Sequence, residues 1–263
     1  MLDFPRQPFA LSTTSQQPSM ASASTFSARP GASSSAADAG TAVGDWKEIV
    51  PRAFVAQVLS QEECDKLLGR FKPEDYKSLD EEYHPSYRSG SRVMFDDTVL
   101  AKELLDRTLK AIPPLQEGVS VEMGSKHNPV WAAGSSDEGE WKPHSLNYRF
   151  RLNKTARGQH FARHSDSMYD LDPPKVKGWM TFLLYLSTME PADGGRTLFF
   201  DKPGKGTNWR TVGVAAKYRP IAGQVLVFDH GILHEGEMVA TAGTTPKYVL
   251  RTDMEFTRAS APA

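Results

Sequence analysis

Apolar residues near the start of the folded region recur with helical spacing. Order is expected from Trp46, with a short strand within residues 46–59. Ser60 and Glu63 form a capping box, which predicts a helix start. The apolar positions that follow are spaced three and four apart, at Cys64, Leu67, Leu68 and Phe71. A second helix is expected after Asp96 or Asp97, ending at Pro113-Pro114, with an apolar stripe of Leu100, Leu104, Leu105, Leu109 and Ile112.

Short apolar runs replace the helical pattern in the second half of the chain. Gly, Pro and Asp clusters separate these runs, which is typical of strands and turns. The polar segments at residues 74–90 and 124–144 are expected to be loops, and the second carries Trp131 and Trp141. Two helices followed by many strands predict an α+β, mainly β domain with a sandwich or barrel. The expected strands are Leu146–Leu152, Gln159–His164, Trp179–Leu186, Arg196–Phe200, Gln224–Phe228 and Lys247–Phe256.

Residues 1–45 are rich in Ser, Ala, Thr, Gln and Pro and show no periodicity. Such a segment cannot bury enough apolar surface to fold, so a disordered tail is expected. Its Arg6 and Arg29, with almost no acid before Asp38, also fit an organellar transit peptide. Composition favours the plain tail. We expect a single domain at residues 46–257, with helical support at 46–115, a β core at 116–257 and a short C-terminal tail at 258–263.

Composition narrows the partners and the compartment. The 263-residue chain is 39% hydrophobic and 24% charged, as in a globular protein with a core. Its net charge of −1 gives no electrostatic case for nucleic acid or an anionic membrane. Cys64 is the only cysteine, so intramolecular disulfides are excluded and an intracellular location, cytoplasmic or nuclear, is expected. No apolar run approaches the length of a membrane span.

The pair His164 and Asp166 carries the first candidate chemistry. Residues two apart on a strand point to the same side, so this imidazole and carboxylate can grip one ion. A second histidine from a distant strand would complete the facial triad of non-haem iron(II) oxygenases. His234 follows the apolar run Gln224–Phe228, and a barrel can return it beside the pair. The alternatives are a solvated strand end and a hydrogen-bonded turn histidine.

Two cations and a tyrosine form the second candidate group. Lys247 and Arg251 share one face of the last expected strand with Val249. A cation in an apolar strand is costly unless it is paired with an anion. That anion is either a protein carboxylate or a bound substrate carboxylate, for which the hydroxyl of Tyr185 offers a further contact.

Five sequence blocks, in order, resemble the prolyl-4-hydroxylase-like iron(II)/2-oxoglutarate dioxygenases. The similarity runs from about residue 90 to residue 257. It implies a double-stranded β-helix, or jelly-roll, with N-terminal helices packed on it. The blocks are Arg149-Phe150-Arg151, Gly158 with His164-Ser165-Asp166, Thr181-Phe182-Leu183-Leu184-Tyr185-Leu186, Gly194-Gly195-Arg196-Thr197-Leu198-Phe199-Phe200, and His234-Glu235-Gly236 with Gly243 and Lys247-Tyr248.

The resemblance also implies roles for individual residues. His164, Asp166 and His234 would be the catalytic iron ligands. Lys247 would form a salt bridge with the distal carboxylate of 2-oxoglutarate, and Tyr185 would donate a hydrogen bond to it. Arg251 could share or replace the contact of Lys247, although block position favours Lys247. Thr197 follows the Gly-Gly turn near the site and is either a co-substrate contact or purely structural.

This chain departs from its close relatives at two positions. They often carry tyrosines where Asn153 and Thr155 stand here, so the co-substrate contacts of those rings are not expected. His160 and His230 are rival imidazoles that do not fit the family pattern.

The implied activity requires Fe(II), with 2-oxoglutarate and O2 as co-substrates and ascorbate as a further candidate. It would hydroxylate a substrate C–H bond while decarboxylating 2-oxoglutarate to succinate and CO2. A peptidyl prolyl residue is the first substrate expected, and a small molecule the second. Arg92, Trp131 and Trp141 could line the substrate mouth or be ordinary surface and packing residues.

Two competing interpretations differ in class. A demethylase of alkylated nucleic acid would share the superfamily fold, but its last strand typically reads Arg-x-Asn-x-Thr-x-Arg, and residues 247–253 do not. A cupin-like binding module would be expected to lack a metal ligand, and none is missing here.

Overall fold

The computed structural model describes residues 45–122, 138–167, 169–172, 176–202, 208–243 and 245–259. Residues 1–44 of the expected N-terminal tail lie outside the described residues. Trp131 and residues 260–263 lie outside them as well. None of the described helices is long and apolar enough to cross a membrane.

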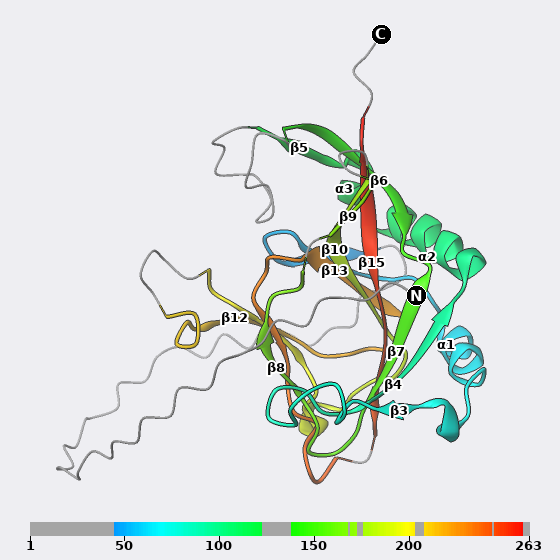
Figure 1. Ribbon diagram of the computed structural model, residues 1–263, viewed down its shortest axis with the longest axis vertical. Helices are drawn as coiled ribbons and strands as arrows, with labels where there is room; N and C mark the ends of the chain where they lie inside the picture. The colour runs from blue at the N-terminus through cyan, green and yellow to red at the C-terminus, as the bar shows by residue number, and fades with distance from the viewer. Residues whose placement is uncertain are drawn as a thin grey trace, which may run out of the picture. The chain divides into compact units, whose positions relative to one another are not determined.

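The larger layer is an antiparallel sheet that holds eleven of the described strands (Figure 1). Its main path runs β1-β2-β13-β10-β15-β7-β4-β3, and β5, β6 and β9 pair beside that path. The central strands β10 and β15 pair along most of their length, from Val176 opposite Thr257 to Tyr185 opposite Val249. The strands are β1 Trp46–Val50, β2 Ala53–Gln57, β3 Lys77–Ser78, β4 Ser91–Asp96, β5 Val119–Val121, β6 Gly139–Leu146, β7 Arg149–Thr155, β9 Tyr169–Asp172, β10 Val176–Tyr185, β13 Gln224–Asp229 and β15 Lys247–Arg258.

The smaller layer is a four-stranded antiparallel sheet in the order β12-β11-β14-β8. Its strands are β8 Phe161–His164, β11 Thr197–Phe200, β12 Val214–Tyr218 and β14 His234–Gly236. Buried apolar side chains of both sheets meet in one cluster, among them Phe199 from β11 and Phe228 from β13. The predicted mainly β fold is confirmed, and its two antiparallel sheets, packed through this cluster, are consistent with the predicted double-stranded β-helix.

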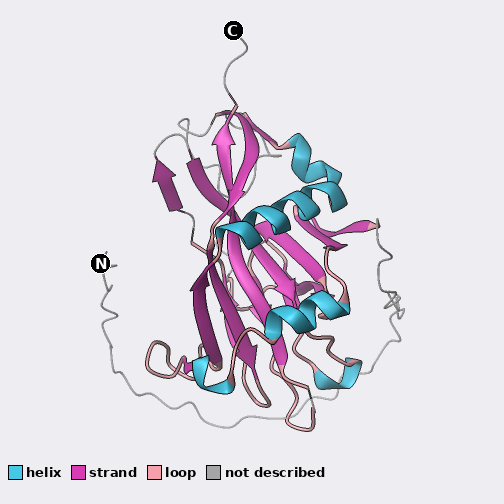
Figure 2. Ribbon diagram, turned by 90° about the vertical axis from the view of Figure 1, so that its right-hand side faces the viewer, coloured by secondary structure: helices cyan, strands magenta, loops and turns pink. Residues whose placement is uncertain are grey.

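Helices cover one face of the larger sheet (Figure 2). The capping box of the first helix is confirmed, because Glu63 N donates to Ser60 Oγ at 3.2 Å and Ser60 N donates to Glu63 Oε2 at 2.7 Å. Asp97, rather than Asp96, caps the second helix by accepting from Leu100 N at 2.9 Å. The helices are α1 Gln61–Leu68, α2 Thr98–Ala111 and α3 Pro113–Glu117, with the 3-10 turns η1 Pro73–Asp75 and η3 Pro191–Asp193.

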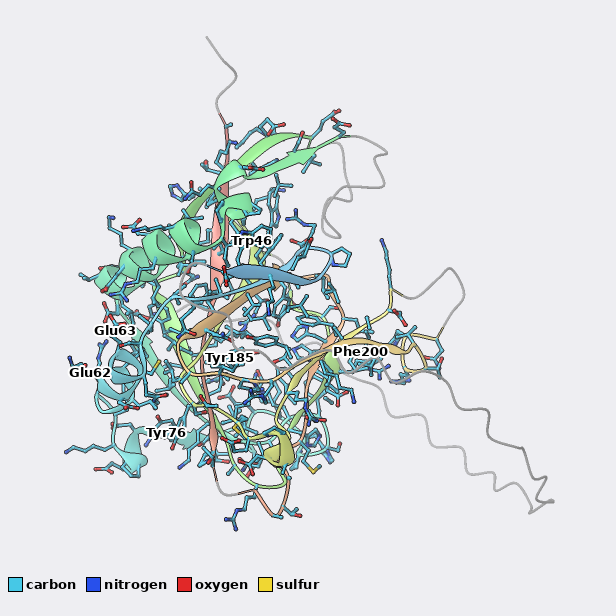
Figure 3. All side chains as sticks on the ribbon, turned by 180° about the vertical axis from the view of Figure 1, so that it is seen from behind. Trp46, Glu62, Glu63, Tyr76, Tyr185 and Phe200 are labelled. Carbon is cyan, nitrogen blue, oxygen red and sulfur yellow. The ribbon has the colours of Figure 1, made fainter. Side chains whose placement is uncertain are left out.

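Strand β10 is buried on both faces, which explains its unbroken apolar run. Phe182 and Leu184 belong to the core cluster that includes helix side chains. Tyr185 belongs to the cluster between the sheets, and Leu183 packs against that cluster. Figure 3 shows Tyr185 in the interior, whereas Glu62 and Glu63 lie outside on α1. This alternation divides the strand between a structural face and a face toward the second sheet.

The side chain of Phe182 is fully buried in the helix-facing core. Its replacement by Ala is expected to lower the free energy of unfolding by about 3–5 kcal/mol, because transfer and cavity contributions add. Urea denaturation measures this change. The control Val99→Ala, at a side chain 76% exposed on α2, should change the free energy by less than about 0.5 kcal/mol.

Two of the strand and loop predictions are wrong. Leu146–Leu152 is not one strand, since a turn at Asn147 separates β6 from β7. There Asn147 Oδ1 accepts a hydrogen bond from Arg149 N at 2.9 Å. This bond between a side chain and the backbone forms a turn and competes with the hydrogen bonds of the sheet. Residues 139–144, expected to be loop, belong to β6, because pairing with β15 and β5 recruits a polar segment into the sheet.

Candidate metal centre

The small sheet brings two histidines together across a strand pair. His164 ends β8 and His234 begins β14, and the two are direct partners in the antiparallel register. Asp166 follows β8 by two residues, where its N–H donates to His230 O at 2.9 Å. One ligand atom from each of His164, Asp166 and His234 lies within 4.8 Å of the others. The structure thus gathers three side chains suited to a single metal ion.

Hydrogen bonds orient both imidazoles toward the carboxylate. His164 Nδ1 lies 2.8 Å from Ala162 O, and His234 Nδ1 lies 2.9 Å from Ile232 O. A carbonyl oxygen only accepts, so each Nδ1 carries the proton and each Nε2 presents a lone pair. These Nε2 atoms lie 3.7 Å and 3.6 Å from the Asp166 carboxylate oxygens. The three donors therefore face a common point.

Burial sets the protonation states that a metal would need. It lowers the pKa of the His164 imidazole to about 3, with a further contribution from His234. Burial likewise lowers the pKa of His234. Burial alone would raise the pKa of Asp166, but Arg251 and the two imidazoles lower it below its usual range. Near neutral pH the site holds two neutral imidazoles and one carboxylate.

Two side chains from the larger sheet hold the Asp166 carboxylate. Thr181 on β10 donates its hydroxyl to Oδ2 at 2.5 Å, and Arg251 on β15 approaches Oδ1 at 3.1 Å. The same Arg251 Nη2 lies 3.1 Å from Asp253 Oδ1, which His230 Nε2 also contacts at 3.2 Å. Arg251 is thus engaged by two carboxylates. The position of Arg251 indicates that it helps to hold the Asp166 carboxylate in place.

Lys247 begins β15, on the same face of the strand as Arg251, but its environment differs from that of Arg251. Its side chain is buried, with Nζ 5.8 Å from the centroid of the Tyr185 ring. Among the residues that the structure describes, no carboxylate lies within 4 Å of Nζ. Burial lowers the pKa of Lys247 to about 8, partly offset by Glu237. The Tyr185 hydroxyl lies 2.7 Å from Thr197 Oγ1, so Thr197 separates the phenol from the pocket.

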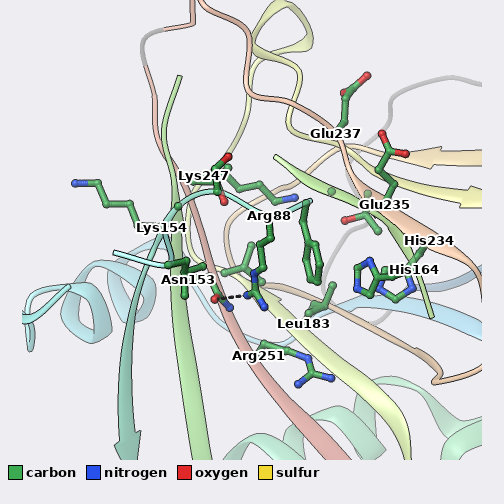
Figure 4. A pocket seen from close by; sticks show the side chains of 18 of the residues that line it. Arg88, Asn153, Lys154, His164, Leu183, His234, Glu235, Glu237, Lys247 and Arg251 are labelled. Carbon is green, nitrogen blue, oxygen red and sulfur yellow. Dashed lines mark hydrogen bonds between the residues drawn. The ribbon is translucent and has the colours of Figure 1, made fainter. Parts of the chain in front are cut away.

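A pocket between the sheets joins these groups (Figure 4). Of the residues predicted for iron and 2-oxoglutarate, Tyr185 alone does not line it and lies behind Thr197. Figure 4 shows Lys247 and Arg251 extending into it from β15. The predicted residues that line the pocket are His164, Asp166, Thr197, His234, Lys247 and Arg251.

Other predicted residues lie elsewhere. Arg92 on β4 pairs with Glu82 at 2.7 Å and is not part of the pocket lining. Trp141 on β6 is fully buried and packs against Trp179 with ring centroids 4.3 Å apart. Trp131 falls outside the described residues. The rival His160 approaches Ser86 O at 3.1 Å rather than the triad.

Several pocket residues were missed from the sequence. Leu183 lines the pocket, and Thr181 beside it contacts Asp166; both share the strand parity of Tyr185, which could have indicated their direction. Arg88 comes from the polar loop before β4, where no periodicity indicates a direction. Asn153 stands where relatives often carry a tyrosine ring, and its Oδ1 accepts a hydrogen bond from Arg88 Nη2 at 2.9 Å. The remaining missed residues include Phe161, Glu235 and Glu237.

Residues 150–252 match the family model of the 2OG-Fe(II) oxygenase superfamily. No curated protein sequence matches the chain.

Three solved structures illustrate the structural similarity. The viral collagen prolyl hydroxylase vCPH of Paramecium bursaria Chlorella virus-1, in complex with 2OG, is 18% identical; 78% of this chain and 96% of that chain are covered, with a TM-score of 0.44. A Pseudomonas putida prolyl-4-hydroxylase is 14% identical, with 82% and 93% covered and a TM-score of 0.46. HygX from Streptomyces hygroscopicus, with nickel and 2-oxoglutarate bound, is 11% identical, with 80% and 84% covered and a TM-score of 0.45.

Proposed function

We propose that the chain is a member of the 2OG-Fe(II) oxygenase superfamily, whose family model residues 150–252 match, and that it hydroxylates a substrate C–H bond. The reaction would consume O2 and convert 2-oxoglutarate to succinate and CO2. The observation that carries this proposal is the convergence of His164, Asp166 and His234 in one pocket with a buried cation, Lys247, that has no carboxylate within 4 Å among the described residues.

The three donors fit an iron(II) ion. Neutral imidazole and carboxylate suit this metal, and a three-residue face leaves other coordination positions open. The carbonyl contacts of both Nδ1 atoms leave each Nε2 free to bind. Bound Fe(II), with 2-oxoglutarate and O2, supplies the oxidising power, and the protein supplies binding and orientation.

Lys247 is the proposed partner of the distal carboxylate of 2-oxoglutarate. It is buried without a described acid within 4 Å, whereas Arg251 is already engaged by Asp166 and Asp253. Thr197 faces the same pocket and offers a hydroxyl beside this carboxylate. We assign Tyr185 a supporting role, because its hydroxyl contacts Thr197.

Apolar side chains would limit water around the reacting groups. Leu183 and Val249 line the pocket from the larger sheet, and Phe161 lines it from the smaller one. The Phe161 ring stacks on His164 with centroids 3.7 Å apart. This wall holds the imidazole in place and strengthens electrostatic contacts inside the pocket.

Succinate formation by the purified full chain tests the proposal. With Fe(II), 2-oxoglutarate and O2, we expect succinate above a no-iron control even without substrate, and a chelator should stop it. Addition of prolyl peptides, then of small molecules, should reveal a substrate that stimulates turnover. Absence of iron-dependent succinate under all these conditions would refute the assignment.

Arg251 should affect metal binding more than co-substrate binding. The variant Arg251→Gln is expected to weaken iron affinity about 10–100-fold, because it removes a partner that orients a ligand carboxylate. The KM for 2-oxoglutarate, measured at saturating iron, should change far less. Arg149→Gln is the matched control, since Arg149 is exposed on β7 and pairs with Asp96. A rise in KM without loss of iron affinity would instead make Arg251 the carboxylate anchor.

A further inference from the structure

A loop that carries Arg88 is fastened along the outer edge of β8. Residues 79–90, here called the edge loop, close on themselves, because Leu79 N donates to Gly90 O at 3.0 Å. Ala162 N donates to Tyr87 O at 2.7 Å, and Ser89 N donates to His160 O at 3.0 Å. These two bonds flank Arg88, and its side chain points into the pocket (Figure 4). The direction of Arg88 is therefore set by backbone pairing on both sides.

Aromatic rings and an amide hold the guanidinium in one orientation. Arg88 Cζ lies 4.3 Å from the centroid of Phe161 and 5.1 Å from that of Tyr83. Its Nη2 donates to Asn153 Oδ1 at 2.9 Å, and Asn153 Nδ2 donates in turn to Arg151 O. In the described part of the chain, no carboxylate lies within 4 Å of this guanidinium. Asn153 takes one of the five N–H donors, and the guanidinium belongs to the pocket lining.

Burial and two like charges act against the guanidinium in this position. Burial lowers the pKa of Arg88, and Arg92 and Arg251 lower it further, whereas Tyr83 and the Asp166 carboxylate raise it in part. The side chain still stays charged, because an arginine is not deprotonated in proteins. Its surroundings thus favour the arrival of an anion. Besides Asp166, two acids line the pocket. Glu237 is paired with Arg196 at 3.0 Å, and Glu235 comes from the β14 side.

The co-substrate does not account for Arg88. Under the proposed function, the distal carboxylate of 2-oxoglutarate has Lys247, and its oxo-acid end has the metal. Arg88 is a further cation in the same pocket. We propose that Arg88, oriented by Asn153, Phe161 and Tyr83, binds a carboxylate or phosphate group of the substrate. This inference rests on the proposed function and makes the substrate an anion.

The position of Arg88 also limits where the substrate reacts. The Phe161 ring that packs against Arg88 stacks on His164 on the metal side. One aromatic ring thus separates the anion site from a proposed iron ligand. The reacting carbon should lie a few bonds from the anionic group. A planar guanidinium fork fits carboxylate and phosphate alike, so the choice between them is left to measurement.

Binding of small probes tests the anion site directly. The full chain is loaded with Mn(II) and N-oxalylglycine, an analogue that occupies the 2-oxoglutarate positions. Paramagnetic broadening of probe protons then reports binding near the metal for benzoate, phenyl phosphate and benzamide. We expect at least one anion to bind about tenfold more tightly than benzamide, as one charge-assisted hydrogen bond allows.

Variants assign this preference to Arg88. Arg88→Gln should reduce anion binding about tenfold, and Arg88→Lys should retain part of it. Lys154→Gln is the matched control, because Lys154 lines the same pocket but packs near the rings of Tyr76 and Tyr248. The KM for 2-oxoglutarate in substrate-free turnover should stay within about threefold in Arg88→Gln. Unchanged thermal unfolding confirms that the variants are folded.

Three results would overturn the inference. Equal binding of benzamide and both anions would exclude an anion site. If Lys154→Gln lost as much anion binding as Arg88→Gln, the preference would come from the overall positive charge of the pocket and not from Arg88. A KM for 2-oxoglutarate raised tenfold in Arg88→Gln would make Arg88 a co-substrate anchor. If the wild type forms succinate but shows no anion preference, the inference alone fails; if no iron-dependent succinate forms, the proposed function fails.

Discussion

The variants His164→Ala and Asp166→Ala are expected to lose stoichiometric iron and to form succinate only at background. Each removes one of three donors, and without Asp166 the cation Arg251 would also lose one of its two carboxylate partners beside the imidazoles. The loss should exceed the roughly 10–100-fold effect of a residue that only orients a ligand. Iron content after anaerobic loading and succinate formation measure the two effects.

His160→Gln is the matched control for these variants. His160 precedes His164 on the same stretch, but its Nε2 approaches Ser86 O and not the triad. Its iron content and succinate formation should match those of the wild type. Undiminished iron and turnover in both triad variants would contradict the assignment.

Replacing Lys247 by Met is expected to raise the KM for 2-oxoglutarate about 100-fold, with a smaller change in kcat. Lys247 is buried, and truncating one partner of a buried charge pair costs about 2–5 kcal/mol. Lys247→Arg keeps the charge and should restore part of the affinity. Steady-state kinetics of substrate-free succinate formation separates KM from kcat. An unchanged KM in Lys247→Met would place the distal carboxylate elsewhere.

The same residue predicts the pH dependence of co-substrate binding. Burial lowers the pKa of Lys247 to about 8 in the free protein, so its ammonium form prevails below that pH and is lost above it. Only the ammonium form can pair with a carboxylate. The KM for 2-oxoglutarate should therefore be flat below about pH 8 and rise about tenfold per pH unit above it. Lys247→Arg should remove this rise, because its guanidinium stays charged.

Strand alternation made part of the site predictable. Because side chains two apart share a face, Lys247, Val249 and Arg251 were expected together, and all three line the pocket. To bring His164 and His234 together, the chain needed a barrel, which the resemblance implied. The register of β8 and β14 makes the two histidines direct partners.

Other features depended on contacts that no local pattern encodes. Block position favoured Lys247 over Arg251, but side-chain chemistry could not separate them, because the engagement of Arg251 by Asp166 arises only when β15 meets the segment after β8. Thr197 stands in front of Tyr185 because β10 and β11, which belong to different sheets, converge there. The edge loop has no periodicity, so its pairing with β8 and the direction of Arg88 could not be foreseen.

The self-closing edge loop has a consequence for how such an enzyme can change. The proposed metal and co-substrate residues extend from strands or lie beside them, whereas Arg88 belongs to a segment whose two ends meet between Leu79 and Gly90. Compact surface loops of this kind accept replacement and length change far more readily than strands do. Exchange of the loop could thus redirect the enzyme to a new substrate while the oxidising machinery stays intact. Any such graft must still provide backbone partners for Ala162 and His160, or β8 is left with an open edge.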